Sequence, residues 1–184
     1  MREVGRNNQW RPDRCYIRAW EAAGPYTLAS VIDPRLNVQT GIEPTLPPAG
    51  TLWRRVTAES KALVNLSRIY GSAALGTTIT QVWLRTPIYS DKPQVKRLSL
   101  GWLREAWVYV NGKKVFAARN LYGTVESRPP GGALSLQNAT INVPLHRGVN
   151  VVLIALDDNF AGGQHFGWGL QARWQDMSGI APRT

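Results

Sequence analysis

Asp157, Asp158 and Asn159 form the one acidic cluster of a chain that contains 12 aspartate and glutamate residues. A pair of carboxylates can act as general acid and base in glycoside hydrolysis, or can bind calcium through hard oxygen atoms. Adjacent residues of a β-strand point to opposite faces, so Asp157 and Asp158 make a poor acid–base pair unless the chain turns there. We expect these residues to lie in a surface loop. Asp176, at the end of the last predicted strand, could at most be a calcium ligand.

The sequence gives little support for nucleophilic catalysis or for a zinc site. The chain has no Gly-x-Ser-x-Gly elbow. Cys15 lies in a predicted strand, where we expect a small core residue. The two histidines, His146 in a hairpin turn and His165 in a glycine-rich loop, complete a tetrahedral zinc site only if carboxylates join them. The sequence leaves enzymatic activity undecided and favours a protein without it.

Predicted strands must position these residues. Asn111-Gly112 lies between two apolar runs and predicts a type I′ hairpin turn, which needs positive φ at both central positions. No stretch of 12 residues has a helical period. Many short strands with regular turns are typical of an all-β, antiparallel sandwich. The predicted strands span residues 14–20, 51–58, 63–67, 77–86, 95–101, 106–110, 114–118, 139–143, 149–156 and 167–175.

The chain of 184 residues is most simply one domain. We expect a loose leader over 1–13, a sandwich over 14–176 and a tail over 177–184. One cysteine excludes an internal disulfide, and no run of 18 apolar residues predicts a membrane span.

Alternating strand directions bring several loops to one end of this sandwich. They are the turn 102–105 and the loops 119–138 and 157–167. Sugar recognition needs an aromatic face beside planar polar groups, and Trp102 or Tyr122 could supply that face. Alternatively, Trp102 and Phe166 cap the core. The candidate ligand-binding residues at this end are Trp102, Arg104, Glu105, Arg119, Tyr122, Asp157, Asp158, Asn159, His165 and Phe166.

Other aromatic rings lie on the predicted strands. Trp107 and Tyr109 share one strand face, and Trp83 stands opposite its apolar neighbours. These rings could form a flat platform for a polysaccharide. We expect instead that they form a core covered by the N-terminal segment and the loop 33–50.

The net charge is +10, and arginines outnumber lysines by 17 to 5. The guanidinium group forms two-pronged contacts with carboxylate, sulfate or phosphate. The excess indicates either a solvated basic surface or an anionic partner. Only this charge favours nucleic acid as a binding partner, because the sequence shows no basic helix and no OB-type pattern.

The chain resembles the galactose-binding-domain-like jelly rolls over roughly residues 14–176. The pieces that carry the resemblance are Ile17–Trp20 leading to Gly24–Tyr26, Trp53–Val56 leading to Ala62–Leu66, Val82–Thr86 leading to Leu98–Gly101, and Val108–Gly112 leading to Pro144-Leu145, Gly148–Asn150 and Val152-Leu153. Such domains accompany many secreted glycoside hydrolases, lyases and peptidases. The resemblance implies a secreted, periplasmic or cell-surface module that binds sugar or is purely structural, often with a structural calcium ion. The turn after Gly101 is often acidic in these domains, whereas here it is Trp102–Glu105.

The sequence thus predicts a non-catalytic carbohydrate-binding accessory module, with arginines that favour an acidic polysaccharide. One alternative is a structural domain that packs against a catalytic partner and exposes an apolar patch. The other is a glycan-active hydrolase or lyase, in which Asp157 or Asp158 would have to meet His165 in a cleft.

Overall fold

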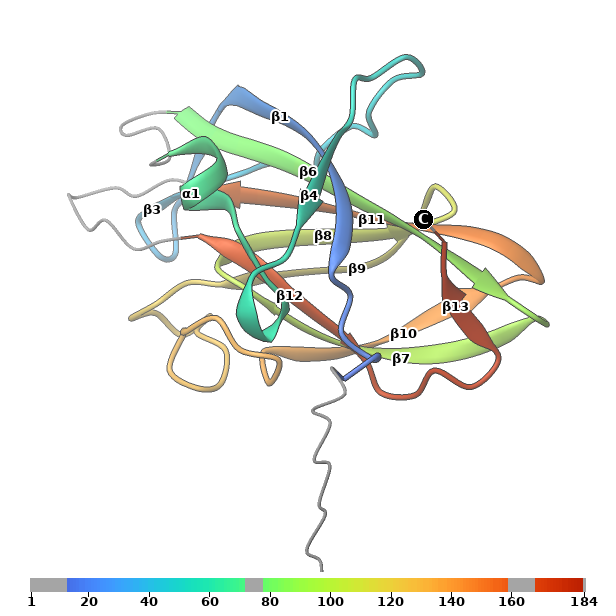
Figure 1. The fold of residues 1–184 in the computed structure, drawn as a ribbon. Helices are drawn as coiled ribbons and strands as arrows, with labels where there is room; N and C mark the ends of the chain where they lie inside the picture. Colours follow the sequence, from blue (N-terminus) through green and yellow to red (C-terminus); the bar gives the residue numbers. More distant parts are fainter. Residues whose placement is uncertain (1–12, 72–77, 159–167, 184) are drawn as a thin grey trace, which may run out of the picture.

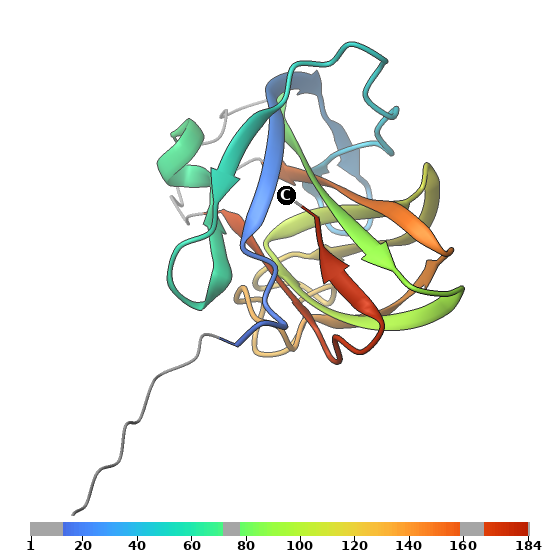
Figure 2. The same cartoon turned by 45° about the vertical axis from the view of Figure 1, so that its right-hand side comes forward.

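A computed structural model of the chain describes residues 13–71, 78–158 and 168–183. Its strands form two antiparallel layers (Figures 1 and 2). In spatial order, the larger sheet contains β4 (Arg54–Thr57), β1 (Ala19–Ala29), β6 (Thr78–Ser90), β11 (Gly148–Asp158), β8 (Arg104–Val110) and β9 (Lys113–Asn120), and β13 (Ile180–Pro182) also pairs with β6. The smaller sheet contains β10 (Ala139–Leu145), β7 (Gln94–Trp102), β12 (Gly169–Trp174) and β5 (Leu63–Asn65).

Short elements complete the described chain. The strands β2 (Val31–Asp33) and β3 (Val38–Thr40) form a separate hairpin. The helical elements are η1 (Ser60–Ala62) and α1 (Leu66–Tyr70). Among the described residues, no helix reaches the length and hydrophobicity needed to cross a membrane.

The main core lies between the two sheets. Alternate residues of β7, Leu98, Leu100 and Trp102, point into it and are fully buried. Leu170 and Trp174 of β12 do the same, because alternate residues of a strand point to the same face. The predicted antiparallel β-sandwich is therefore confirmed.

The Asn111-Gly112 turn joins β8 to β9 as predicted. Both residues have positive φ, 51° and 79°. The Asn111 side chain also donates to Asn150 Oδ1 at 2.8 Å and accepts from the Val151 amide at 2.9 Å. These bonds tie the turn to β11.

Three local features differ from the prediction. The strand predicted over 63–67 ends at Asn65, whose side chain caps α1 by accepting from the Arg68 amide at 3.0 Å. Cys15 is partly exposed rather than a core residue. The segment expected as a tail contains β13, which pairs with β6.

Successive strands are not always neighbours. After Trp102 the chain leaves the smaller sheet and enters the larger one at Arg104, whose φ is 63°. Strands β7 and β8 thus face each other across the core instead of forming a hairpin.

Candidate functional site

The predicted gathering of loops at one end is confirmed for the described residues. Glu105, near the start of β8, pairs with Asp157 near the end of β11 and with Arg119 near the end of β9. The β2–β3 hairpin packs against the same end, because Gln39 accepts from Arg104 of β8 and Asp33 accepts from Arg119 of β9. Gly41, directly after the hairpin, donates to Glu105. The site is therefore built on a rigid sheet and closed by loops.

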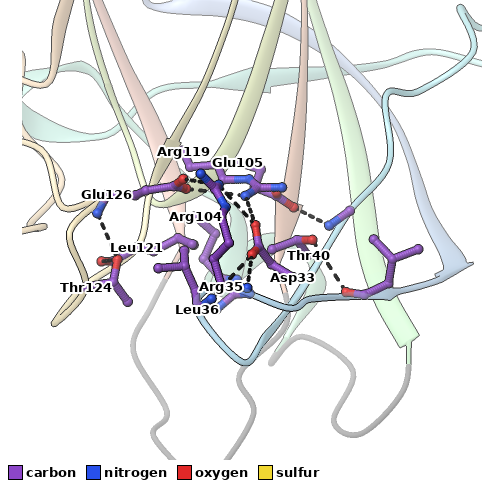
Figure 3. A network of polar contacts seen from close by, with 12 residues as sticks. Asp33, Arg35, Leu36, Thr40, Arg104, Glu105, Arg119, Leu121, Thr124 and Glu126 are labelled. Carbon is purple, nitrogen blue, oxygen red and sulfur yellow. Dashed lines mark hydrogen bonds and ion pairs between the residues drawn. The ribbon is translucent and has the colours of Figure 1, made fainter.

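Arg119 is the centre of a charged network at this end (Figure 3). Its Nη1 lies 2.7 Å from Asp33 Oδ2 and 3.4 Å from Glu126 Oε2, and its Nε lies 3.0 Å from Glu105 Oε1. Arg35 adds contacts to Asp33 and Glu126 from the hairpin. The Arg119 hydrogen bond holds the pKa of Asp33 far below its ordinary value. The network fixes one guanidinium between three carboxylates.

Beneath this network, two carboxyl groups are buried side by side. The Gly41 amide donates to Glu105 Oε2, and a Cβ atom at Gly41 would lie only 1.9 Å from Asp157 Oδ2. Gln81 Nε2 donates to Asp157 Oδ1 at 2.8 Å. Burial, with a further contribution from the Glu105 charge, raises the pKa of Asp157 to about 7. Burial also raises the pKa of Glu105.

The expectation of a surface loop at Asp157 and Asp158 is wrong, because β11 continues through both residues and both are fully buried. Asp157 faces Gln81 and Gly41, whereas Asp158 Oδ1 lies 4.0 Å from Arg104 Nε. Their side chains occupy opposite faces of the strand, so they cannot share one substrate as acid and base.

A groove of about 710 Å³ opens above the charged network, on the outer face of β8 and β9. Glu43 and Gly41 form one wall, and the segment 125–129 forms the other. The floor is made by Trp107, Arg119 and two alanines of β9, Ala117 and Ala118. The groove therefore combines part of one indole ring with several planar charged groups.

Of the ten predicted site residues, Glu105 and Arg119 line this groove. Arg104 instead turns away, donating to the Gln39 carbonyl at 2.5 Å, and burial lowers its pKa. Tyr122 is 65% exposed but does not line the groove. Asn159, His165 and Phe166 lie outside the described residues.

The prediction of Trp102 as a sugar platform is wrong. Its side chain is fully buried and packs edge-on against Phe116, with ring centroids 5.7 Å apart. Its Nε1 donates to the Arg104 carbonyl at 3.3 Å. The alternation of β7 directs this ring into the core, so the alternative of a core residue holds.

The structure places three aromatic rings of the larger sheet in largely buried positions, those of Trp83, Trp107 and Tyr109. This agrees with the expectation of a core and not with a flat platform. They form a second cluster on the outer face of the larger sheet. Tyr109 Oη donates to the Pro44 carbonyl at 3.3 Å, which fastens the segment before β4 over them. Trp107 lies at the border of this cover and so reaches the groove.

Sequence reasoning missed several groove residues, namely Glu43, Glu126, Ser127 and Arg128. They belong to two long loops whose course the strand pattern does not determine. Lys114 pairs with Glu43, and Arg128 Nε donates to the Arg119 carbonyl at 3.2 Å. The in-register pairing of Glu105 with Arg119 was the one signal that could have located the groove.

Among the described residues, no group of three or more His, Cys, Asp or Glu side chains could hold a metal ion. The Asp176 carboxylate, considered as a ligand, is bound by Lys96 Nζ at 2.5 Å and by the Ser178 hydroxyl. A structural calcium ion therefore stays a prediction.

The sequence matches no protein-family model and no curated protein. Among solved structures, the chain is similar to part of a β-glucosidase from Kluyveromyces marxianus, with a TM-score of 0.50 and 15% identity over 85% of this chain and 17% of that one. A family 35 carbohydrate-binding module from an environmental isolate aligns over 91% of this chain and 98% of the module, with a TM-score of 0.42 and 12% identity. Another, from Clostridium thermocellum, aligns over 52% and 77%, with a TM-score of 0.31 and 13% identity. The likeness to the β-glucosidase segment and the two antiparallel sheets confirm the antiparallel β-sandwich fold expected from the sequence.

Proposed function

We propose that the protein is a non-catalytic carbohydrate-binding module and that the groove over β8 and β9 is its ligand site. The observation that carries the proposal is the fixed guanidinium of Arg119 on the floor of that groove, beside the ring of Trp107. Sugar hydroxyls are both donors and acceptors, so a groove that offers guanidinium and carboxylate groups together suits them.

Preorganisation supports this proposal. Arg119 is held by Asp33, Glu105 and Glu126, so little side-chain freedom remains to be lost when a ligand binds. Ser127 and Arg128 add a hydroxyl and a second guanidinium at the wall. The volume of about 710 Å³ falls in the range of small-molecule sites.

An acidic polysaccharide remains the ligand that the net charge of +10 favours. The groove itself balances Glu43, Glu105 and Glu126 against Arg119 and Arg128, so a preference for anionic chains would come from the basic surface around it. A role as a secreted accessory module beside a catalytic domain would fit this function.

Affinity electrophoresis tests the proposal. The protein should be retarded in gels that contain a polysaccharide it recognises, across a panel of neutral and uronate chains. Ala117 is exposed on the groove floor, so Ala117→Trp should fill the groove without entering the core. We expect this variant to lose at least tenfold in affinity, whereas the control Thr140→Trp, on exposed β10 surface, should bind as the wild type does. Equal weak retention on every polysaccharide would contradict the proposal.

A structural role is the second candidate, and one specific observation favours it. A largely apolar groove of about 390 Å³ runs between Tyr26, Ile42, Leu46 and the prolines that precede β4. Ile32 and Leu52 nearby in the chain are 65% and 91% exposed. An exposed apolar surface of this kind is typical of a site that another domain covers.

A further inference from the structure

A further groove, separate from the two described above, runs along the edge of the larger sheet opposite the carbohydrate site. Its volume is about 370 Å³, and its lining residues come from β4 and from the segment around α1. In the sheet order, β4 is the first strand and β9 the last, so the two grooves lie at opposite edges. Figures 1 and 2 show α1 beside β4.

The edge of β4 is open among the described residues. The strand pairs with β1 on one side, over Arg54–Thr57, and no other described strand pairs with its outer side. An open edge presents alternating backbone donors and acceptors to any extended chain that lies beside it. Four residues at about 3.3 Å each offer a pairing length of about 13 Å.

Arginines surround this edge. Arg54, Arg55 and Arg68 line the groove against a single carboxylate, Glu59, which is bound by Arg68 at 2.9 Å. Glu21, opposite Arg55 in the register, is bound by Arg85 at 2.7 Å. Within the described part of the chain, Arg54 and Arg55 therefore form no ion pair, and both are exposed.

Arg54 is held in place by an aromatic ring. Its guanidinium lies 4.3 Å from the centroid of the Tyr70 ring. Stacking fixes the plane of the group and leaves its N–H edges directed outward for an anion. The same contact covers one face of the Tyr70 ring, so that face is closed to sugar rings and to nucleic-acid bases.

We propose that this groove binds an extended acidic polypeptide segment, which adds as a strand to the edge of β4. Backbone hydrogen bonds along the edge would supply affinity, and the three arginines would select acidic side chains. Charge complementarity is the reason for choosing an acidic partner, and the unpaired strand edge is the reason for choosing a polypeptide. The inference does not depend on the carbohydrate groove.

Fluorescence anisotropy with two labelled peptides tests it. One is a capped Glu-Val-Glu-Val-Glu-Val peptide, and the other has the same sequence with alternate backbone amides N-methylated, so that it keeps its charge but cannot pair along one edge. We expect the first to bind and the second to bind at least tenfold more weakly. Equal binding of both, or no binding of either, would overturn the proposal.

Matched charge reversals locate the site. Arg54→Glu combined with Arg55→Glu should weaken peptide binding at least tenfold. Arg97→Glu combined with Arg147→Glu changes the net charge equally at exposed positions elsewhere, and should weaken binding less than twofold. If the first pair fails to fold, Arg55→Glu alone serves, because that side chain is exposed. Equal losses in the two pairs, or tighter binding of polygalacturonate or duplex DNA than of the peptide at equal charge concentration, would contradict an acidic strand as the partner.

Discussion

At the scale of single residues, the buried carboxyl pair Glu105 and Asp157 is the most consequential feature of the site. Glu105 accepts from the Gly41 amide and from Arg119, and Asp157 accepts from Gln81. Asp157 Oδ2 is buried and accepts no hydrogen bond from the described residues. An ionised carboxylate in such a place is costly, so burial favours the protonated form of Asp157.

This burial predicts a pH-dependent stability. The Asp157 carboxyl has an ordinary pKa of 3.8 and a pKa of about 7 in the folded protein. Between these values the folded state binds more protons than the unfolded state, so the free energy of unfolding falls as the pH rises from about 4 to 7. Asp157→Asn keeps an acceptor for Gln81 and removes the titration. We expect the variant to gain about 1–4 kcal/mol relative to the wild type across this window, because one pKa unit corresponds to about 1.4 kcal/mol.

Urea denaturation at pH 4.5 and pH 8 measures this effect. Asp176→Asn is the control, since Asp176 is a surface carboxylate whose pKa is lowered by Lys96. Parallel pH profiles for the wild type and Asp157→Asn would show that Asp157 does not titrate in this range.

Residue types alone could not reveal this pair. The sequence identified Asp157, Glu105 and Arg119 as members of one end, which holds. It could not show that β11 extends through Asp158, or that Gly41, directly after β3, binds Glu105 and lies against Asp157. Trp102 lies in the core and not on the surface, because alternate residues of β7 point between the sheets and Trp102 is one of them.

At the scale of elements, the β2–β3 hairpin is the part that completes the site. Asp33 accepts from the Arg35 amide at 2.8 Å and binds Arg119 at 2.7 Å. Gly41, just after β3, reaches Glu105 because it has no side chain. The hairpin therefore holds the floor of the groove in place from outside the sheet.

Removing its anchor should loosen the hairpin. Asp33→Ala takes away the contact with Arg119 and the bond to the Arg35 amide, and we expect a loss of about 1–3 kcal/mol. Amide hydrogen exchange over residues 31–41 should become faster, while β6 and β11 stay protected. Arg35→Ala is the control, because that side chain is 73% exposed and its ion pairs contribute less. Unchanged exchange in Asp33→Ala would exclude the anchoring role.

The hairpin turn between β8 and β9 gives a separate test of the fold. Gly112 has a φ of 79°, and a Cβ atom added there would have no neighbour within 4 Å, so a side chain meets backbone strain alone. We expect Gly112→Ala to lower the melting temperature by an amount equivalent to about 1–2 kcal/mol. Lys113→Ala, at the next exposed position, should change it little. A melting temperature equal to the wild type in Gly112→Ala would contradict the type I′ geometry.

Most elements could be predicted because they are local. Polar and apolar residues alternate along β7 and β12, as in strands with one buried face, and Asn-Gly identified the turn between β8 and β9. The crossing from β7 to the other sheet at Arg104 was not visible, because a short turn reads alike for a hairpin and for a sheet-to-sheet connection. The helix α1 is five residues long, too short to show a period.

At the scale of the whole molecule, the net charge is the feature that bears on the proposed preference for an acidic polysaccharide. The net charge of +10 resides mainly on arginines, and Arg54 and Arg55 lie outside any ion pair within the described residues. Retention of the protein in a gel with an acidic polysaccharide should weaken steeply as NaCl is raised from low to high concentration, because salt screens exposed charges. Retention in a neutral polysaccharide that it recognises should change little. If salt weakened retention equally in the acidic and the neutral gel, the groove would not bind sugar through contacts with its hydroxyl groups.

Binding of a sugar chain in the groove over β8 and β9 is tested most directly by amide chemical-shift mapping. A ¹⁵N-labelled sample is titrated with an oligosaccharide of whichever polysaccharide retards the protein. We predict that the largest shifts fall on residues 117–119 and 125–129, and that Ala117→Trp abolishes them. Shifts confined to other surfaces, or none with any oligosaccharide, would contradict a carbohydrate site in this groove.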